Sequence, residues 1–62
     1  MEDMTKRMQD AGELLVDLVA DSEGQNRETA RSGLEITARL LDAAGLGEES
    51  GTLRRRGAAA AA

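Results

Sequence analysis

The sequence contains no cysteine, histidine, proline, phenylalanine, tyrosine or tryptophan among its 62 residues. Without cysteine the chain has no disulfide, no thiol nucleophile and no cysteine-ligated zinc. Without histidine it lacks the commonest metal ligand and the usual proton carrier near neutral pH. Without aromatic rings it has no platform on which nucleic-acid bases stack. We therefore expect one domain at most, no enzyme, no cofactor, no metal and no small-molecule substrate.

The sequence is also poor in side chains that could build a large core. Hydrophobic residues make up 40% of the chain, but many of them are alanine. The larger ones are eight leucines, two valines, one isoleucine and three methionines. A short chain with so few large apolar side chains and no disulfide bond has marginal stability as an isolated domain. We therefore expect the chain to be stabilised by oligomerisation or by docking on a larger partner.

Charge and hydropathy limit the partners and the location. The net charge is −4, from 12 acidic and 8 basic residues, which disfavours nonspecific binding of nucleic acid by the body of the protein. No apolar run approaches the 18 or more residues typical of a membrane-spanning helix. The segment Met1–Met4 is acidic and has no apolar stretch of the signal-peptide kind. We expect no membrane association, no targeting segment and a place in the cytoplasm of the host cell.

Apolar spacing predicts a first helix over residues 2–23. The stripe of this helix has the 4, 3, 4, 3 spacing of a helical seam and consists of Met4, Met8, Ala11, Leu15 and Leu18. The opposite face is acidic, and we interpret it as solvated because no histidine is present to complete a metal site. Gly12 interrupts the helix, either by simple tolerance or because a neighbouring helix approaches closely there.

A chain reversal is predicted between residues 22 and 26. Gly24 suits a left-handed position at the end of the first helix, with Asn26 as the N-cap of the next. The other arrangement makes Ser22 the N-cap, with Gln25 as its capping-box partner. A connection this short predicts an antiparallel helical hairpin. One long bent helix is the remaining alternative.

The second predicted helix, over residues 27–44, has apolar residues on two faces. One stripe is Ala30, Leu34, Ala38 and Leu41, and the other set is Ile36, Leu40, Ala43 and Ala44. A helix that is apolar on two faces usually has two neighbours. We expect the first helix to be one neighbour and a second chain to be the other. Alternatively, Ile36 is merely an exposed aliphatic residue.

The sequence predicts a tail after the second helix. Ala44, Gly45 and Leu46 match the Schellman pattern, with glycine at C′ and an apolar residue at C″. A polar, glycine-containing linker follows, then three adjacent arginines, Arg54, Arg55 and Arg56. The closing alanine run favours helix but is too short to hold one alone. We therefore divide the chain into a helical hairpin, 1–46, and a flexible tail, 47–62.

In length and helical outline, the chain resembles the small plasmid-copy-number RNA-binding proteins that form antiparallel dimeric four-helix bundles. Those proteins place basic and aromatic residues on one helix face, and this chain has neither there. The resemblance therefore implies an architecture and no function.

These observations predict an all-α fold, a two-helix hairpin that completes a four-helix bundle by homodimerisation or by docking on a partner. The predicted intra-hairpin seam is Leu15, Leu18, Leu34 and Leu41. The predicted partner interface is Met4, Met8, Ile36 and Leu40. The function we expect is that of a non-enzymatic interaction or assembly protein, acting as an adaptor, a regulator or a small structural subunit, as in a phage-like particle. The alternative is a dimeric nucleic-acid-associated regulator in which Arg54, Arg55 and Arg56 contact phosphates or an acidic partner.

Overall fold

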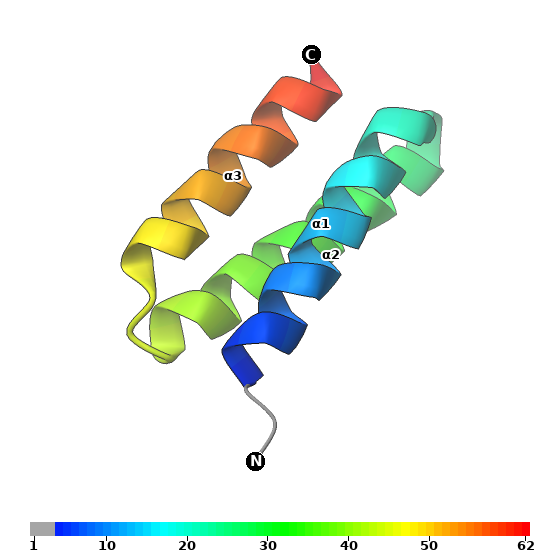
Figure 1. Ribbon diagram of the computed structural model, residues 1–62. Coiled ribbons are helices and arrows are strands. Elements are labelled where there is room, and N and C mark those ends of the chain that lie inside the picture. Colours follow the sequence, from blue (N-terminus) through cyan, green and yellow to red (C-terminus); the bar gives the residue numbers. More distant parts are fainter. Residues whose placement is uncertain (1–3) are drawn as a thin grey trace.

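The computed structural model describes residues 4–62, which form three helices and contain no strand. They are α1 (Met4–Asp21), α2 (Gly24–Ala43) and α3 (Gly47–Ala61). In Figure 1, α1 and α3 run in the same direction and α2 runs the opposite way behind α1, so the chain is an up-down-up bundle. Each helix contacts both of the others, and the bundle measures 37 × 20 × 13 Å. The all-α prediction is confirmed.

The reversal between α1 and α2 lies where the sequence predicted it. Gly24 has the left-handed φ of +59° that a glycine tolerates. Neither predicted cap is used, because Glu23 is the N-cap of α2 and makes no side-chain cap hydrogen bond. Instead, the Nε atom of Arg27 donates to the carbonyl oxygens of Ser22 at 2.9 Å and Val19 at 3.2 Å. Arg27 thereby satisfies carbonyls that the end of α1 leaves without a helical partner. The predicted helix start at residue 2 lies outside the described residues.

The end of α2 is the predicted Schellman motif. Gly45 has φ +80°, and its N–H donates to the Asp42 carbonyl at 3.0 Å. The N–H of Leu46 donates to the Leu41 carbonyl at 2.9 Å, which completes the pair of bonds that defines the motif. Leu46 also packs against the core. The chain leaves this turn directly into α3.

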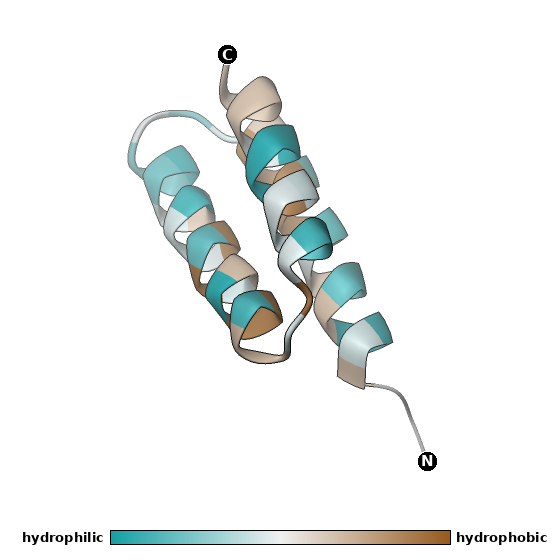
Figure 2. Ribbon diagram, turned by 90° about the vertical axis from the view of Figure 1, so that its left-hand side faces the viewer, coloured by the Kyte–Doolittle hydropathy of each residue, from teal (hydrophilic) through white to brown (hydrophobic). Residues whose placement is uncertain are grey.

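Helix α3 occupies the segment that the sequence predicted as a flexible tail, and that prediction is wrong. Two acidic residues, Glu48 and Glu49, lie in its first turn, where they complement the positive end of the helix dipole. One side of α3 is buried through Ser50, Leu53 and Gly57. Docking on α1 and α2 therefore supplies the stabilisation that a short helix with interior glycines lacks in isolation. Figure 2 faces this helix and shows its last turns in the pale brown of the alanine run.

Leucine–glycine contacts join each pair of helices, and together they form a closed cycle. Leu15 of α1 lies over Gly33 of α2, Leu34 of α2 lies over Gly57 of α3, and Leu53 of α3 lies over Gly12 of α1. A Cβ atom on Gly12 would stand 2.9 Å from Leu53 Cδ1, and one on Gly57 would stand 2.6 Å from Leu34 Cδ1. The helices approach closely because these glycines carry no side chain. Of the two interpretations of Gly12, close packing is the one observed.

The core lies among all three helices, and this position corrects the predicted seam. Leu34 and Leu41 are buried as predicted, and Leu15 is partly buried against the core. Leu18, by contrast, is 51% exposed. Its place is taken by Val16 and Val19, because α1 has two neighbours and its buried face turns toward α3 as well as α2. The buried residues of the core are Val16, Val19, Ala30, Leu34, Ala38, Leu41 and Leu53.

Candidate functional site

Among residues 4–62, five large apolar side chains remain uncovered after the chain has folded. Met4 is 71% exposed, Leu14 65%, Leu18 51%, Ile36 58% and Leu40 53%. Three of them belong to α1 and two to α2, and α3 contributes none. We call these five residues the apolar face. Scattered exposed leucines are ordinary in proteins, so the position of these residues relative to one another decides whether they form a surface.

Two of the three apolar-face residues on α1, Leu14 and Leu18, point away from α3. Gly12 contacts Leu53 of α3, and Leu14 follows it by two residues, which turns the side chain by about 160° on a helix with 3.6 residues per turn. Leu18, six residues after Gly12, is turned by about 120° from it. Both leucines are therefore directed away from the side of α1 that α3 covers.

The apolar-face residues on α2 are also directed away from α3. Leu34 contacts Gly57 of α3, and Ile36 follows Leu34 by two residues while Leu40 follows it by six. Leu15 and Gly33 mark the junction between α1 and α2, and Leu18 and Ile36 each lie one turn beyond them. The apolar face thus spans the α1–α2 junction on the side of the bundle opposite α3.

The structure places the four predicted interface residues unequally. Met4, Ile36 and Leu40 belong to the apolar face, whereas Met8 is partly buried against the core. The stripe of α2 that includes Leu34 packs within the same chain, with α3 as the second neighbour. The sequence reasoning did not assign Leu14 to the interface. Its position four residues before Leu18 was the signal that could have placed it there.

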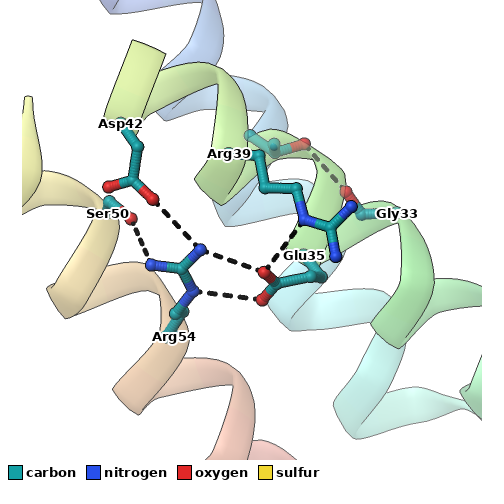
Figure 3. A network of polar contacts seen from close by, with 7 residues as sticks. Gly33, Glu35, Arg39, Asp42, Ser50 and Arg54 are labelled. Atoms are coloured by element: carbon teal, nitrogen blue, oxygen red, sulfur yellow. Dashed lines mark hydrogen bonds and ion pairs between the residues drawn. The ribbon is translucent and has the colours of Figure 1, made fainter. Parts of the chain in front are cut away.

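The arginines of the predicted phosphate-binding segment lie on α3, and Arg54 is held by α2 (Figure 3). Its Nε and Nη2 atoms donate to the two carboxylate oxygens of Glu35 at 3.1 and 3.0 Å. Nη1 donates to Ser50 Oγ at 2.9 Å, and Nη2 lies 3.1 Å from Asp42 Oδ2. Arg39 donates to the same Glu35 carboxylate at 3.4 Å. The Arg54 guanidinium therefore joins α3 to α2.

Arg56 joins α3 to α1 in the same manner. Its guanidinium donates to both carboxylate oxygens of Glu13, at 2.8 Å for the bond from Nη2. Hydrogen bonds from Arg56 lower the pKa of Glu13, and hydrogen bonds from Arg54 lower that of Glu35. Within residues 4–62, Arg55 is the member of the trio that pairs with no carboxylate, and it donates to Thr52. Two of the three arginines predicted to contact phosphate thus bind carboxylates of this chain.

Two shallow grooves flank α3. One, of about 240 Å³, lies between α1 and α3 beside Gly12 and Leu53, and the other, of about 420 Å³, lies between α2 and α3 beside Arg31 and Gly57. Over the described part of the chain, no three acidic side chains gather into a cluster that could hold a metal ion. None of the helices from Met4 onward is long and apolar enough to cross a membrane.

Comparison with known proteins found no matching family model, no similar curated protein and no similar solved structure.

Proposed function

We propose that this protein is a small non-enzymatic interaction or assembly protein that works by presenting its apolar face to another protein chain. The observation that carries the proposal is the placement of five large apolar side chains, each more than half exposed, on one side of the α1–α2 pair. Contiguous exposed apolar residues on a soluble domain are typical of an interaction surface.

The chain is large enough to carry an interface of ordinary size. A stable protein interface buries about 800 Å² on each partner. This chain exposes 4294 Å² in total, so such an interface would cover about a fifth of it. Met4 lies near one end of the bundle and Leu18 near the other, so the apolar face follows most of the length of α1. Partial burial of five such side chains is a substantial driving force, because each fully buried one contributes roughly 1.5–3 kcal/mol.

The experiment compares the wild type with a variant in which the apolar face is charged. Leu18→Glu and Ile36→Glu together should leave the helical content unchanged, because both side chains are exposed. Thr52→Glu with Ala59→Glu is the matched control, since both residues are exposed on α3 and the added charge is the same. Association is measured by sedimentation of the purified chain up to about 1 mM and by affinity capture from the host.

We expect the wild type and the control to associate with the same protein, and the face variant to lose that association. The proposal is contradicted if the face variant retains the same protein as the wild type. It is contradicted equally if the wild type stays monomeric and captures nothing that the face variant does not.

A further inference from the structure

We propose that the occupant of the apolar face is an amphipathic helix that carries lysine or arginine along one edge. This inference rests on the proposed function and names the chemistry of the partner. It is carried by the charges that border the apolar face on α1 and by the exposed apolar residues on both sides of the α1–α2 junction.

The junction between α1 and α2 is covered by α3 on one side and borders the apolar face on the other. On the covered side, α3 lies across the same two helices and buries Leu53 between them. On the open side, exposed residues of α1 and α2 flank the Leu15–Gly33 contact. A helix laid along this side would meet apolar side chains from both edges of the junction, which is the helix-in-groove mode of recognition.

Acidic residues predominate along the α1 edge of the apolar face, where Arg7, three residues after Met4, is a basic neighbour. Asp10 and Asp17 lie four residues before and three residues after Leu14, and Asp21 lies three residues after Leu18, so each is a surface neighbour of an apolar-face leucine. All three are exposed. Asp10 has Lys6 at 3.8 Å, whereas Asp17 and Asp21 have no ion pair within 4 Å among residues 4–62. Asp17 nevertheless interacts electrostatically with Arg56 of α3, so Asp21 is the carboxylate beside the apolar face for which residues 4–62 supply no basic neighbour, and Asp17 is shared between Arg56 and a cationic partner.

The α2 edge of the apolar face has no surplus of acidic residues. Arg39 follows Ile36 by three residues and is bound to Glu35 of the same helix. The charge of the face therefore comes from the α1 edge, and the net charge of the whole chain is −4. Electrostatic complementarity selects against a partner that brings negative charge to this edge. An anionic membrane, a nucleic acid and a second copy of this chain are all disfavoured on that ground.

The test uses two synthetic 18-residue helical peptides that share one leucine stripe and differ on the polar face, which is all lysine in one and all glutamate in the other. Binding of each labelled peptide to the full chain is measured by fluorescence anisotropy at 50 mM and 500 mM NaCl. We expect the lysine peptide to bind at least about tenfold more tightly at 50 mM, and we expect salt to reduce this ratio to less than about threefold.

Three variants separate the apolar from the electrostatic contribution. Asp17→Asn with Asp21→Asn should weaken binding of the lysine peptide about three- to tenfold at low salt. Glu48→Gln with Glu49→Gln removes the same charge from α3 and should change binding less than twofold. Leu14→Ser with Ile36→Ser should abolish binding of both peptides.

The outcomes distinguish the two proposals. Equal affinity for the two peptides, lost in the Leu14→Ser, Ile36→Ser variant, overturns the cationic partner and leaves the proposed function standing. Binding that survives in that variant, or no binding of either peptide, overturns both. Equal losses in the Asp17→Asn, Asp21→Asn variant and in the α3 control show attraction to net charge alone, which overturns the inference. Dimerisation through the face at 50 mM NaCl would identify a second copy as the occupant and would also overturn it.

Discussion

Leu53 is the one large apolar side chain that α3 contributes to the core, so Leu53→Ala tests how this helix is held. Leu53 is 7% exposed and its methyl groups lie against Gly12, which has no side chain that could move to fill the space. Leucine-to-alanine changes in cores cost about 2.7–5.0 kcal/mol. Because a groove of about 240 Å³ already lies beside Leu53, the new space is open to water, and we expect about 2–3 kcal/mol.

A loss of this size is large for this chain. A domain of 62 residues has a free energy of unfolding of roughly 3–9 kcal/mol, and the docking of one helix is only part of it. Undocked, α3 should unravel, because a 15-residue helix with interior glycines is not stable alone. In the folded chain, α3 supplies 15 helical residues, compared with 18 in α1 and 20 in α2. The circular dichroism signal at 222 nm should therefore fall by at least a quarter at 25 °C.

The control is Leu40→Ala, the same chemical change at a position that is 53% exposed, and it should cost less than about 1 kcal/mol. Adding Gly12→Ala to Leu53→Ala should restore about 1 kcal/mol, since alanine favours helix and its methyl group enters the emptied space. In the wild type the same Cβ would stand 2.9 Å from Leu53 Cδ1, so the gain should be smaller there. The reasoning is refuted if Leu53→Ala keeps the full helical signal and melts with the wild type, or if the two changes are additive within about 0.3 kcal/mol.

Three further predictions concern the other contacts of α3. Gly57→Ala should lower Tm despite the better helix propensity of alanine, because its Cβ would stand 2.6 Å from Cδ1 of the buried Leu34; thermal melts check this, and a higher Tm would contradict it. Arg54→Met should lower Tm by about 2–4 °C in 50 mM NaCl and by less in 1 M NaCl, since salt screens half-exposed ion pairs; an equal loss at both salt concentrations would contradict the electrostatic account. Acid should destabilise the fold, because the pKa of Glu35 is lowered from its ordinary 4.5 in the folded state: stability is complete above pH 4.5 and falls as the pH drops through the folded-state value. Urea unfolding between pH 6 and pH 2.5 should show this slope, and Glu35→Gln should flatten it; an unchanged slope in that variant would show that Glu35 does not contribute.

Local sequence signals determined the first two helices and the positions of the two turns, but not every helix end. Helix α1 ends at Asp21 and α2 begins at Gly24, where residues 23 and 27 were predicted. The spacing of large apolar residues predicted both elements, and Gly24 and Gly45 predicted the turns because a left-handed φ is a property of single residues. The exposed positions of Ile36 and Leu40 also follow from the pattern, since a helix with two apolar faces cannot bury both against one neighbour. The identity of that second neighbour did not follow.

Only the tertiary structure decided that α3 is a helix, that it packs on the Leu34 stripe of α2 and leaves Ile36 and Leu40 exposed, and that its arginines Arg54 and Arg56 bind carboxylates of α2 and α1. Its inward side, counted from the preceding Leu46, has the spacing 4, 3, 4, 3 of the first helix but within α3 consists largely of small residues: Ser50, Leu53, Gly57 and Ala60. Small side chains give almost no hydrophobic signal along the sequence. They stabilise this fold because leucines from the other helices enter the space they leave, as Leu34 does over Gly57, and that complementarity exists only between helices.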